Sequence, residues 1–163
     1  MKTYTAAVVG CGRMGGFIDN ASGGGRSYSF AAAFGLSERT ELVTGADLRA
    51  HILKEWGDQY EVHEDKLYAD YRELIDTEKP DIVAVGTHAE DRAEIMIYAA
   101  EHGAKAIYAE KALCATIGEA EAIVEAVERN GVVFNMGTGR RWDDGFIKMK
   151  EIVDSGDLGK LQA

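Results

Sequence analysis

The fold of this chain is decided by a stretch near its start, Ala6-Ala7-Val8-Val9-Gly10-Cys11-Gly12-Arg13-Met14-Gly15. An apolar, β-prone run ends there in a glycine-rich turn with the spacing G-x-G-x-x-G. Gly10 permits a tight turn out of the strand, Gly12 lets a pyrophosphate approach the backbone, and Gly15 lets the next helix pack on the strand. The unpaired N–H groups and the dipole of that helix attract an anion. The spacing predicts a dinucleotide-phosphate turn that includes Arg13 and Met14, although a glycine turn that binds nothing has the same pattern.

The composition is that of one globular domain with an acidic surface. The 163 residues are 46% hydrophobic and 28% charged, and the formal net charge is −10. Nucleic-acid backbones and anionic membranes bind concentrated Lys and Arg, so we expect neither as a partner. Any phosphate must then be held locally, by backbone N–H groups.

Cysteine use and the lack of long apolar segments indicate a reducing compartment. Cys11 and Cys114 have neither CxxC spacing nor Cys/His metal spacing, so we expect no disulfide framework and no metal site. No apolar run approaches the roughly 18–20 residues of a membrane helix. Residues 1–4 lead directly into a strand, without the apolar core of a signal peptide. These observations predict a soluble, cytoplasmic protein.

Strand and helix patterns alternate along the chain, which predicts βαβ units and a mostly parallel sheet. The expected strands cover 4–9, 40–46, 67–69, 81–85, 106–109 and 132–136. The expected helices cover 29–34, 49–58, 71–76, 89–102, 117–130 and 143–155. The predicted fold class is therefore α/β, a doubly wound, mostly parallel Rossmann sheet in three α/β/α layers.

Three consecutive glycines interrupt the first expected helix. The segment 21–27 contains them, and each costs a helix interior about 1 kcal/mol relative to alanine. We therefore expect a loop inserted after the first helical turn. It is either a mobile surface loop or a flap over the cofactor or substrate, with Arg26 facing a phosphate or carboxylate.

Asp47 ends the second expected strand, where dinucleotide-binding folds carry an acid for the adenosine ribose hydroxyls. It follows Gly15 by 32 residues, and removing an insertion of about 12 residues restores the usual spacing of about 20. Alternatively, Asp47 caps a helix that begins near Leu48. A carboxylate here favours NAD because it repels a 2′-phosphate. Arg49, two residues later, leaves NADP as an alternative cofactor.

Further motifs stand at the ends of the later strands, and their order is specific. Thr87 follows the fourth strand, Glu110-Lys111 follows the fifth, and Arg140-Arg141-Trp142 follows the sixth. The run Ser155-Gly156-Asp157-Leu158-Gly159-Lys160 closes the series. Together with the glycine turn and Asp47, this ordered set resembles the N-terminal half of the Gfo/Idh/MocA oxidoreductases over essentially the whole chain.

The resemblance implies a Rossmann domain for NAD, with NADP as the other option, over residues 1–139. Residues 140–163 are then a connecting helix and the start of a missing C-terminal substrate domain. In the family that second domain supplies most of the substrate site and the dimer interface, so we expect a full-length homo-oligomer that acts on a small, carbohydrate-like substrate. Many members oxidise a sugar or cyclitol hydroxyl by hydride transfer to the nicotinamide. The family's further catalytic Asp and His lie beyond residue 163, so the chain alone, whether a fragment or a stand-alone domain, is expected to be catalytically incomplete.

The resemblance also assigns the catalytic candidate. The family's Glu-Lys-Pro motif places its lysine beside the nicotinamide and the reacting hydroxyl, and the matching residue is Lys111. An ammonium there can hydrogen-bond the reacting oxygen and help to move its proton, whereas a lysine at a strand end is otherwise an ordinary surface residue. Thr87 and Glu110 line the nicotinamide end, and Arg141 and Trp142 either contact the cofactor or brace the second domain.

Three departures from the family pattern stand out. Ala112 replaces the proline of Glu-Lys-Pro, so the restriction that proline places on the preceding residue is lost. Residues 87–92 replace a Thr-Pro-x-x-x-His pattern, so either His88 or Arg92 faces the nicotinamide, or His88 is an ordinary loop residue. The insertion at 21–27 is longer than the usual turn.

Two other functions stay open on the sequence. One is a non-catalytic nucleotide-binding or redox-sensing module, which Ala112 and the missing second domain favour. The other is an empty Rossmann-like scaffold used for association.

Overall fold

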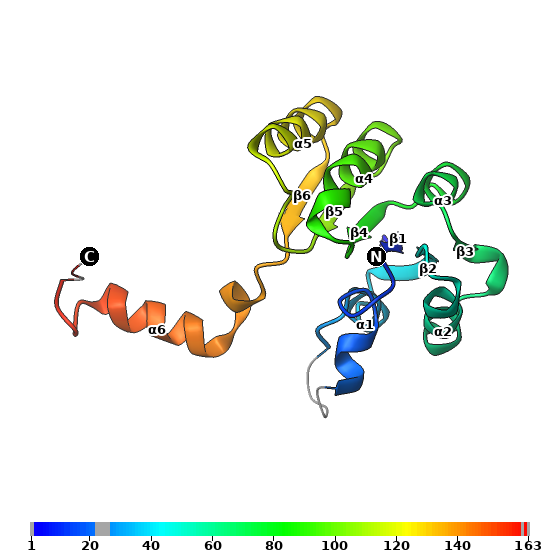
Figure 1. The fold of residues 1–163 in the computed structure, drawn as a ribbon. Helices are drawn as coiled ribbons and strands as arrows, with labels where there is room; N and C mark the ends of the chain where they lie inside the picture. The colour runs from blue at the N-terminus through cyan, green and yellow to red at the C-terminus, as the bar shows by residue number, and fades with distance from the viewer. Residues whose placement is uncertain (1, 22–26, 161, 163) are drawn as a thin grey trace.

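A six-stranded parallel sheet forms the centre of the computed structural model, which describes residues 2–21, 27–160 and 162. The strand order is β3-β2-β1-β4-β5-β6, and each neighbouring pair is parallel (Figure 1). The strands are β1 (Tyr4–Val9), β2 (Thr40–Ala46), β3 (Leu67–Tyr68), β4 (Ile82–Val85), β5 (Ala106–Ala109) and β6 (Val133–Met136). The chain runs outward from β1 in both directions, so the strand order reverses between β1 and β4. Doubly wound folds bind their ligands at such a reversal.

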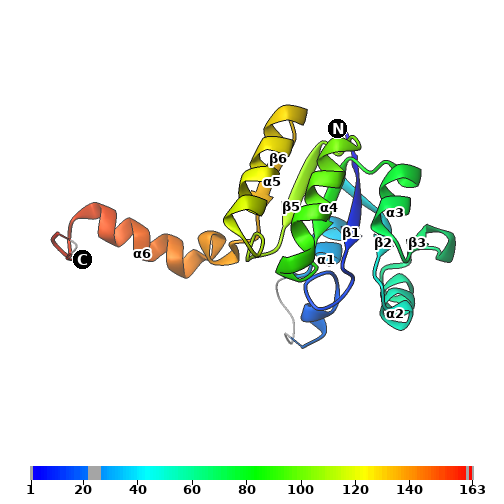
Figure 2. The same ribbon diagram turned by 45° about the horizontal axis from the view of Figure 1, so that its top comes forward.

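Helices cover both faces of this sheet, which confirms the expected doubly wound α/β fold. The α-helices are α1 (Phe30–Leu36), α2 (Ala50–Tyr60), α3 (Tyr71–Glu78), α4 (Ala89–Glu101), α5 (Ile117–Asn130) and α6 (Asp144–Ser155). The short 3₁₀ helices are η1 (Phe17–Ala21), η2 (Glu64–Lys66) and η3 (Gly139–Trp142). Figure 2 shows α3, α4 and α5 side by side on one face of the sheet, while α1 and α2 lie on the other.

The apolar core is split by the sheet because successive strand residues point to opposite faces. Val8 of β1 and Ala84 of β4 pack with Phe30 of α1 and Trp56 of α2. The neighbouring strand residues belong to a second cluster with the buried sides of α3, α4 and α5, represented by Leu74, Met96 and Ile123. Burial on both faces explains why the central strands read as nearly continuous apolar runs.

The first helix differs from the expectation. No α-helix begins in the glycine turn, which is followed instead by η1. The Phe30 and Ala31 N–H groups at the start of α1 donate to the carbonyl oxygens of Met14 (3.0 Å) and Gly15 (3.3 Å). Helix α1 therefore stacks on the end of the glycine turn, although η1 and the following loop separate the two in sequence. Arg26 and most of the expected flap over 21–27 fall within 22–26, outside the described residues.

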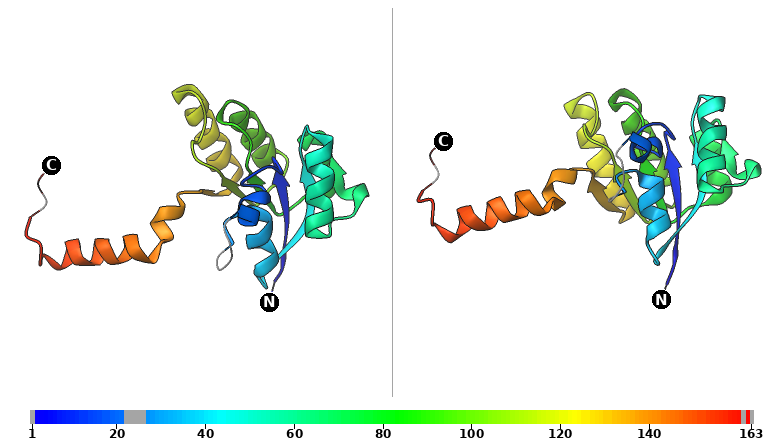
Figure 3. Two further views of the ribbon diagram at one scale, coloured as in Figure 1. Left: turned by 60° about the horizontal axis from the view of Figure 1, so that its bottom comes forward. Right: turned by 90° about the horizontal axis from the view of Figure 1, so that it is seen from below.

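The C-terminal part of the chain extends away from the sheet. Figure 3 shows η3 and α6 projecting from the β6 side in both views, and α6 has no buried residue. Its apolar side chains, including Phe146, Met149 and Ile152, are exposed. Within the described ranges, no helix has both the length and the apolar character needed to cross a membrane.

Candidate cofactor-binding site

A cavity of about 940 Å³ opens at the carboxyl ends of the central strands, where the strand order reverses. Ten predicted site residues line it: Gly10, Gly12, Arg13, Met14, Asp47, Arg49, Thr87, His88, Glu110 and Lys111. They come from four separate strand ends, and the parallel topology brings them to one edge. Leu48 and Tyr71 also line the cavity, and no motif singled them out, although each lies within a few residues of a strand end.

The glycine turn is closed so tightly that two of its positions exclude a side chain. Gly10 has φ +88°, and a Cβ there would lie 2.8 Å from the carbonyl carbon of Gly86 and from the backbone nitrogen of Thr87. A Cβ on Gly15 would lie 2.1 Å from the Gly10 carbonyl oxygen. Gly15 does not line the cavity, so its part is to close the turn against the end of β1.

This turn presents unused hydrogen-bond donors. The backbone N–H groups of Gly12, Arg13 and Met14 have no acceptor among the residues that the structure describes. The Gly15 carbonyl oxygen, by contrast, accepts a 3.1 Å hydrogen bond from Trp56 Nε1. Free amides beside an occupied carbonyl make a concave, electropositive surface of the kind that holds a phosphate.

Asp47 and Arg49 form a close pair at the end of β2. Arg49 donates to the Asp47 carboxylate from its backbone N–H, from Nε and from Nη2, each at 2.9 Å. The Asp47 side chain is 5% exposed and the Arg49 side chain 55%. Burial alone would raise the pKa of Asp47, but the hydrogen bonds from Arg49 hold it below its ordinary value. Helix α2 begins at Ala50, one residue after the expected start, and its N-cap is Arg49, so Asp47 is not the N-cap residue of this helix.

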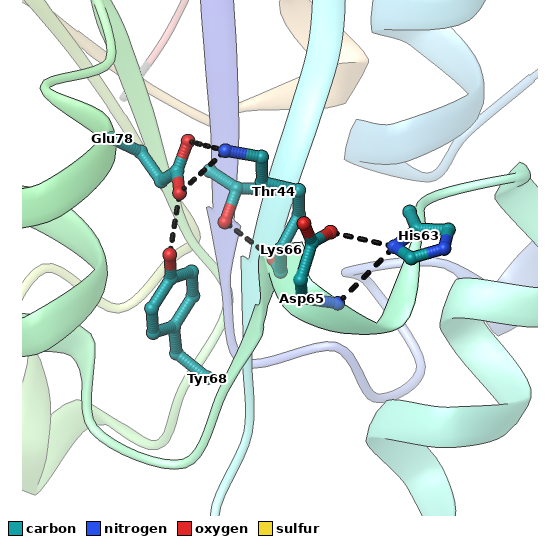
Figure 4. Close-up of polar contacts among 6 residues, drawn as sticks. All are labelled: Thr44, His63, Asp65, Lys66, Tyr68 and Glu78. Carbon is teal, nitrogen blue, oxygen red and sulfur yellow. Dashed lines mark hydrogen bonds and ion pairs between the residues drawn. The ribbon is translucent and has the colours of Figure 1, made fainter.

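A polar network of Thr44, Lys66, Tyr68 and Glu78 connects β3 with β2 and α3 (Figure 4). Asp47 donates its backbone N–H to the Tyr68 carbonyl oxygen at 3.2 Å. The Tyr68 hydroxyl donates to Glu78, whose two carboxylate oxygens also accept from Lys66 Nζ at 3.0 Å each. Thr44 of β2 donates its hydroxyl to the Lys66 carbonyl oxygen at 2.7 Å. The bond to Glu78 is the main reason that the pKa of Tyr68 rises to about 12.

Glu110 and Lys111 stand at the opposite end of the cavity. The Lys111 Nζ lies 3.2 Å from Glu110 Oε1, and the two side chains are 73% and 9% exposed. The Glu110 N–H donates to the Val85 carbonyl oxygen at 3.0 Å, which joins the ends of β4 and β5. An accessible ammonium is thus held at the rim by a buried carboxylate. The Lys111–Ala112 peptide bond is cis.

Arg92 and His88 have different surroundings from each other. Arg92 is 5% exposed, and its guanidinium binds backbone carbonyl oxygens of the two flanking loops. Burial lowers the pKa of Arg92, and the nearby carboxylates of Glu110 and Glu90 oppose this effect. His88 is exposed and stands at the N-cap of α4 without a side-chain capping hydrogen bond. Both line the cavity, but only His88 has its side chain free of such contacts.

Arg141 and Trp142 are not brought to this cavity. Both lie in η3, where Trp142 is 64% exposed and the Arg141 guanidinium is 6.0 Å from its ring centroid. A direct cofactor contact by either residue has no support in this arrangement, while bracing of a second domain stays a prediction. Among the described residues, no group of three or more His, Cys, Asp or Glu side chains is placed to hold a metal ion.

Comparisons with known proteins give the fold and the cavity a family context. The model of the GFO_IDH_MocA oxidoreductase family, an NAD-binding Rossmann fold, matches residues 4–138. Inositol 2-dehydrogenase of Salmonella typhimurium is 31% identical over 121 residues, which are 74% of this chain and 35% of that protein. The crystal structure of myo-inositol 2-dehydrogenase from Lactobacillus plantarum has a TM-score of 0.82 at 26% identity, covering 98% of this chain and 43% of that one.

A further structural neighbour has been solved with ligands. The scyllo-inositol dehydrogenase of Lactobacillus casei, with bound NAD(H) and scyllo-inositol, has a TM-score of 0.80 at 19% identity. The superposed region covers 98% of this chain and 43% of that protein, and at this identity the likeness shows the fold alone. The chain therefore spans well under half the length of these proteins.

Proposed function

The chain belongs to the Gfo/Idh/MocA oxidoreductase family as its NAD-binding Rossmann domain, and from that premise we propose that it is the cofactor-binding part of a dehydrogenase. The reaction is hydride transfer between a nicotinamide and a sugar- or cyclitol-like hydroxyl or carbonyl. The observation that carries the proposal is the convergence of free backbone amides, a buried carboxylate and an accessible lysine on one cavity. The inositol dehydrogenases among the relatives support the substrate class.

The residues present fit NAD. A Cβ built on Gly12 would have no atom within 4 Å except those of the Arg49 side chain, so no backbone obstructs the approach of a pyrophosphate. The amides of residues 12–14 would hold that pyrophosphate, and Asp47 would accept hydrogen bonds from the adenosine ribose. Thr87 and Glu110 would line the nicotinamide end. When bound, the nicotinamide supplies the hydride acceptor or donor.

Lys111 supplies the proton chemistry in this proposal. Its Nζ is accessible at the rim and can hydrogen-bond the reacting oxygen of a substrate. In the oxidising direction, neutral Nζ takes the hydroxyl proton, and in the reducing direction the ammonium returns it. In this proposal Glu110, whose Oε1 lies 3.2 Å from Nζ, orients the Lys111 side chain.

A non-catalytic nucleotide-binding module is the second candidate. Ala112 favours it because the residue after Lys111 lacks the conformational restriction of proline. The two candidates share cofactor binding and differ only in whether Lys111 takes part in turnover. A full-length homo-oligomer and NADP as an alternative cofactor stay predictions.

Cofactor binding is tested by fluorescence titration of the 163-residue chain with NADH. We expect saturable binding in the native chain and at least about 100-fold weaker binding in Gly12→Asp, because the new carboxylate occupies the phosphate position. Gly118→Asp, on the exposed surface of α5, is the matched control. Absence of saturation, or equal affinity in Gly12→Asp, contradicts the proposal.

The reaction is tested in the longest chain that the reading frame encodes, with cyclitols and NAD. Lys111→Met should lower kcat by about 100-fold or more while leaving the NADH affinity within about threefold. Unchanged turnover in this variant favours the non-catalytic module. The 163 residues alone should bind NADH and turn over very slowly or not at all.

A further inference from the structure

Arg92 is a buried cation whose partners are all backbone oxygens. It comes from the first turn of α4 and is 5% exposed. Nη1 donates at 2.8 Å to the Glu110 carbonyl oxygen and also to that of Ala112, while Nη2 donates to the Thr87 carbonyl oxygen. Within the described part of the chain, no carboxylate lies within ion-pair distance of this guanidinium. Arginine is almost never buried without such a partner, so the three carbonyl dipoles compensate its charge together with the more distant carboxylates of Glu110 and Glu90.

The three carbonyl groups that bind Arg92 lie in the two loops that border the cavity. Those of Glu110 and Ala112 lie on either side of Lys111, so one nitrogen atom holds the backbone both before and after the lysine. The Thr87 carbonyl belongs to the loop that follows β4. A single guanidinium therefore fastens the β4 and β5 loops to each other at the point where both border the cavity.

Only arginine can make this connection from one side chain. Its guanidinium is planar, permanently charged and carries five N–H donors in a fixed fork. A neutral histidine has one donor, and a lysine ammonium is a point charge without the fork. Alanine at position 112 places no restriction of its own on Lys111. The conformation of the segment 110–113 therefore depends on these hydrogen bonds, in addition to the Glu110–Val85 backbone bond and the packing of Leu113 on the core.

We propose that Arg92 is the positioning residue for Lys111, since its guanidinium sets the backbone on both sides of the lysine and fixes the distance between the two loops around the nicotinamide end. This inference rests on the proposed function, because Lys111 matters only if the cofactor and substrate meet beside it. Arg92 itself has no role in proton transfer, and its effect reaches the reaction through Lys111.

The test follows the environment of Lys111 in the 163-residue chain. The chain is labelled with ¹³C-lysine, and the Lys111 Cε resonance is identified by its loss in Lys111→Arg. Saturating NADH should shift this resonance in the native chain. In Arg92→Met the shift at saturation should fall below about half of the native value, and Arg92→Lys should give an intermediate shift because it keeps the charge without the fork. Arg129→Met, an exposed arginine of α5 paired with Glu101, should match the native chain.

Measuring the shift at saturation separates positioning from affinity, because every variant is compared fully bound. A native-sized shift in Arg92→Met overturns the inference. Should Arg92→Met fail to fold, as judged by circular dichroism, Arg92→Lys decides, and a native-sized shift there overturns it equally.

A native chain without any NADH-dependent shift contradicts the proposed function rather than the positioning role. The latter is then judged on the free chain by amide hydrogen exchange. The Glu110 N–H donates to the Val85 carbonyl oxygen at 3.0 Å, between the two loops that Arg92 connects. Loss of the charge-assisted hydrogen bonds of Arg92 should speed exchange at Glu110 by about tenfold or more in Arg92→Met, with α5 unchanged. Equal exchange rates overturn the inference.

Discussion

Arg49 binds Asp47 through two side-chain hydrogen bonds of 2.9 Å each, and its Nη2 lies 2.9 Å from the point where a Cβ on Gly12 would stand. The Arg49 guanidinium therefore hydrogen-bonds Asp47, the acid expected to bind the ribose, and also lies over Gly12 in the turn expected to bind the pyrophosphate. A ribose that binds Asp47 must share the carboxylate with Arg49. A 2′-phosphate would be attracted by the Arg49 guanidinium and repelled by the Asp47 carboxylate. The balance between these two side chains is therefore expected to set the preference between NAD and NADP.

Asp47→Asn should shift the cofactor preference toward NADPH. The amide keeps much of the shape but loses the charge that repels a 2′-phosphate, and Arg49 is released to bind it. We expect NADH binding to weaken by about tenfold, or about 1.4 kcal/mol, while NADPH binding holds or strengthens. Parallel fluorescence titrations measure both affinities. Asp58→Asn, an exposed residue of α2 paired with Lys54, should leave their ratio unchanged, and a shift toward NADH in Asp47→Asn would refute the assignment.

The same pair predicts a defined pH dependence of stability. The pKa of Asp47 is lower in the folded chain than the value of about 3.9 expected when unfolded. The unfolded state therefore binds the proton more readily between these two values, and the stabilisation by Asp47 is present above about pH 4 and lost as the pH falls through the folded pKa. The difference in unfolding free energy between the native chain and Asp47→Asn should be constant from pH 7 to about 5 and move against the native chain below about pH 4. Urea unfolding over this range measures it. If the native chain instead became more stable relative to Asp47→Asn on acidification, the assigned direction of the Asp47 pKa shift would be wrong.

Gly15→Ala should destabilise the chain severely. The new Cβ would lie 2.1 Å from the Gly10 carbonyl oxygen and 2.8 Å from the Cys11 Cα, both backbone atoms that cannot rotate away. We expect a loss of about 3 kcal/mol or more in unfolding free energy, at the upper end of overpacking effects. Gly118→Ala is the control, because a Cβ there meets nothing within 4 Å and lies inside α5. That variant should gain up to about 1 kcal/mol, and equal effects in the two variants would contradict the closed turn.

Much of this fold could be predicted because the signals are local. Helix α5 begins and ends where expected, since Thr116 and Glu119 form a capping box and Gly131 adopts the left-handed conformation at its end. Strands β1, β2 and β5 also have their predicted bounds, because each is a β-prone stretch that ends beside glycine or charged residues. The glycine spacing was recognisable directly, and Asp47 was recognisable once an insertion of about 12 residues, which includes 21–27, is allowed for.

The remaining features depend on contacts between distant residues. The helical turn expected to begin inside the glycine turn is absent, and α1, found close to the expected residues 29–34, takes its starting hydrogen bonds from Met14 and Gly15, which its own sequence does not reveal. Arg92 was expected to face the nicotinamide if it had a role, but its partners are backbone carbonyl oxygens, which leave no pattern in a sequence. The arrangement gathers most of the predicted site residues at one cavity, while their individual roles stay predictions.

The glycine turn also predicts unequal reactivity of the two thiols. Cys11 is fully buried beneath the turn, and burial, followed by the negative charge of Asp47, raises the pKa of its thiol, whereas Cys114 is partly exposed. Since the thiolate is the reactive form, a disulfide reagent such as DTNB should modify one thiol quickly in the native chain. The second should react at least about 1,000-fold more slowly, through global unfolding. Cys114→Ser should abolish the fast phase and Cys11→Ser should preserve it. A fast phase in Cys114→Ser would mean that the turn opens in the native state, and the tight packing of Gly15 on Gly10 would then not describe the protein in solution.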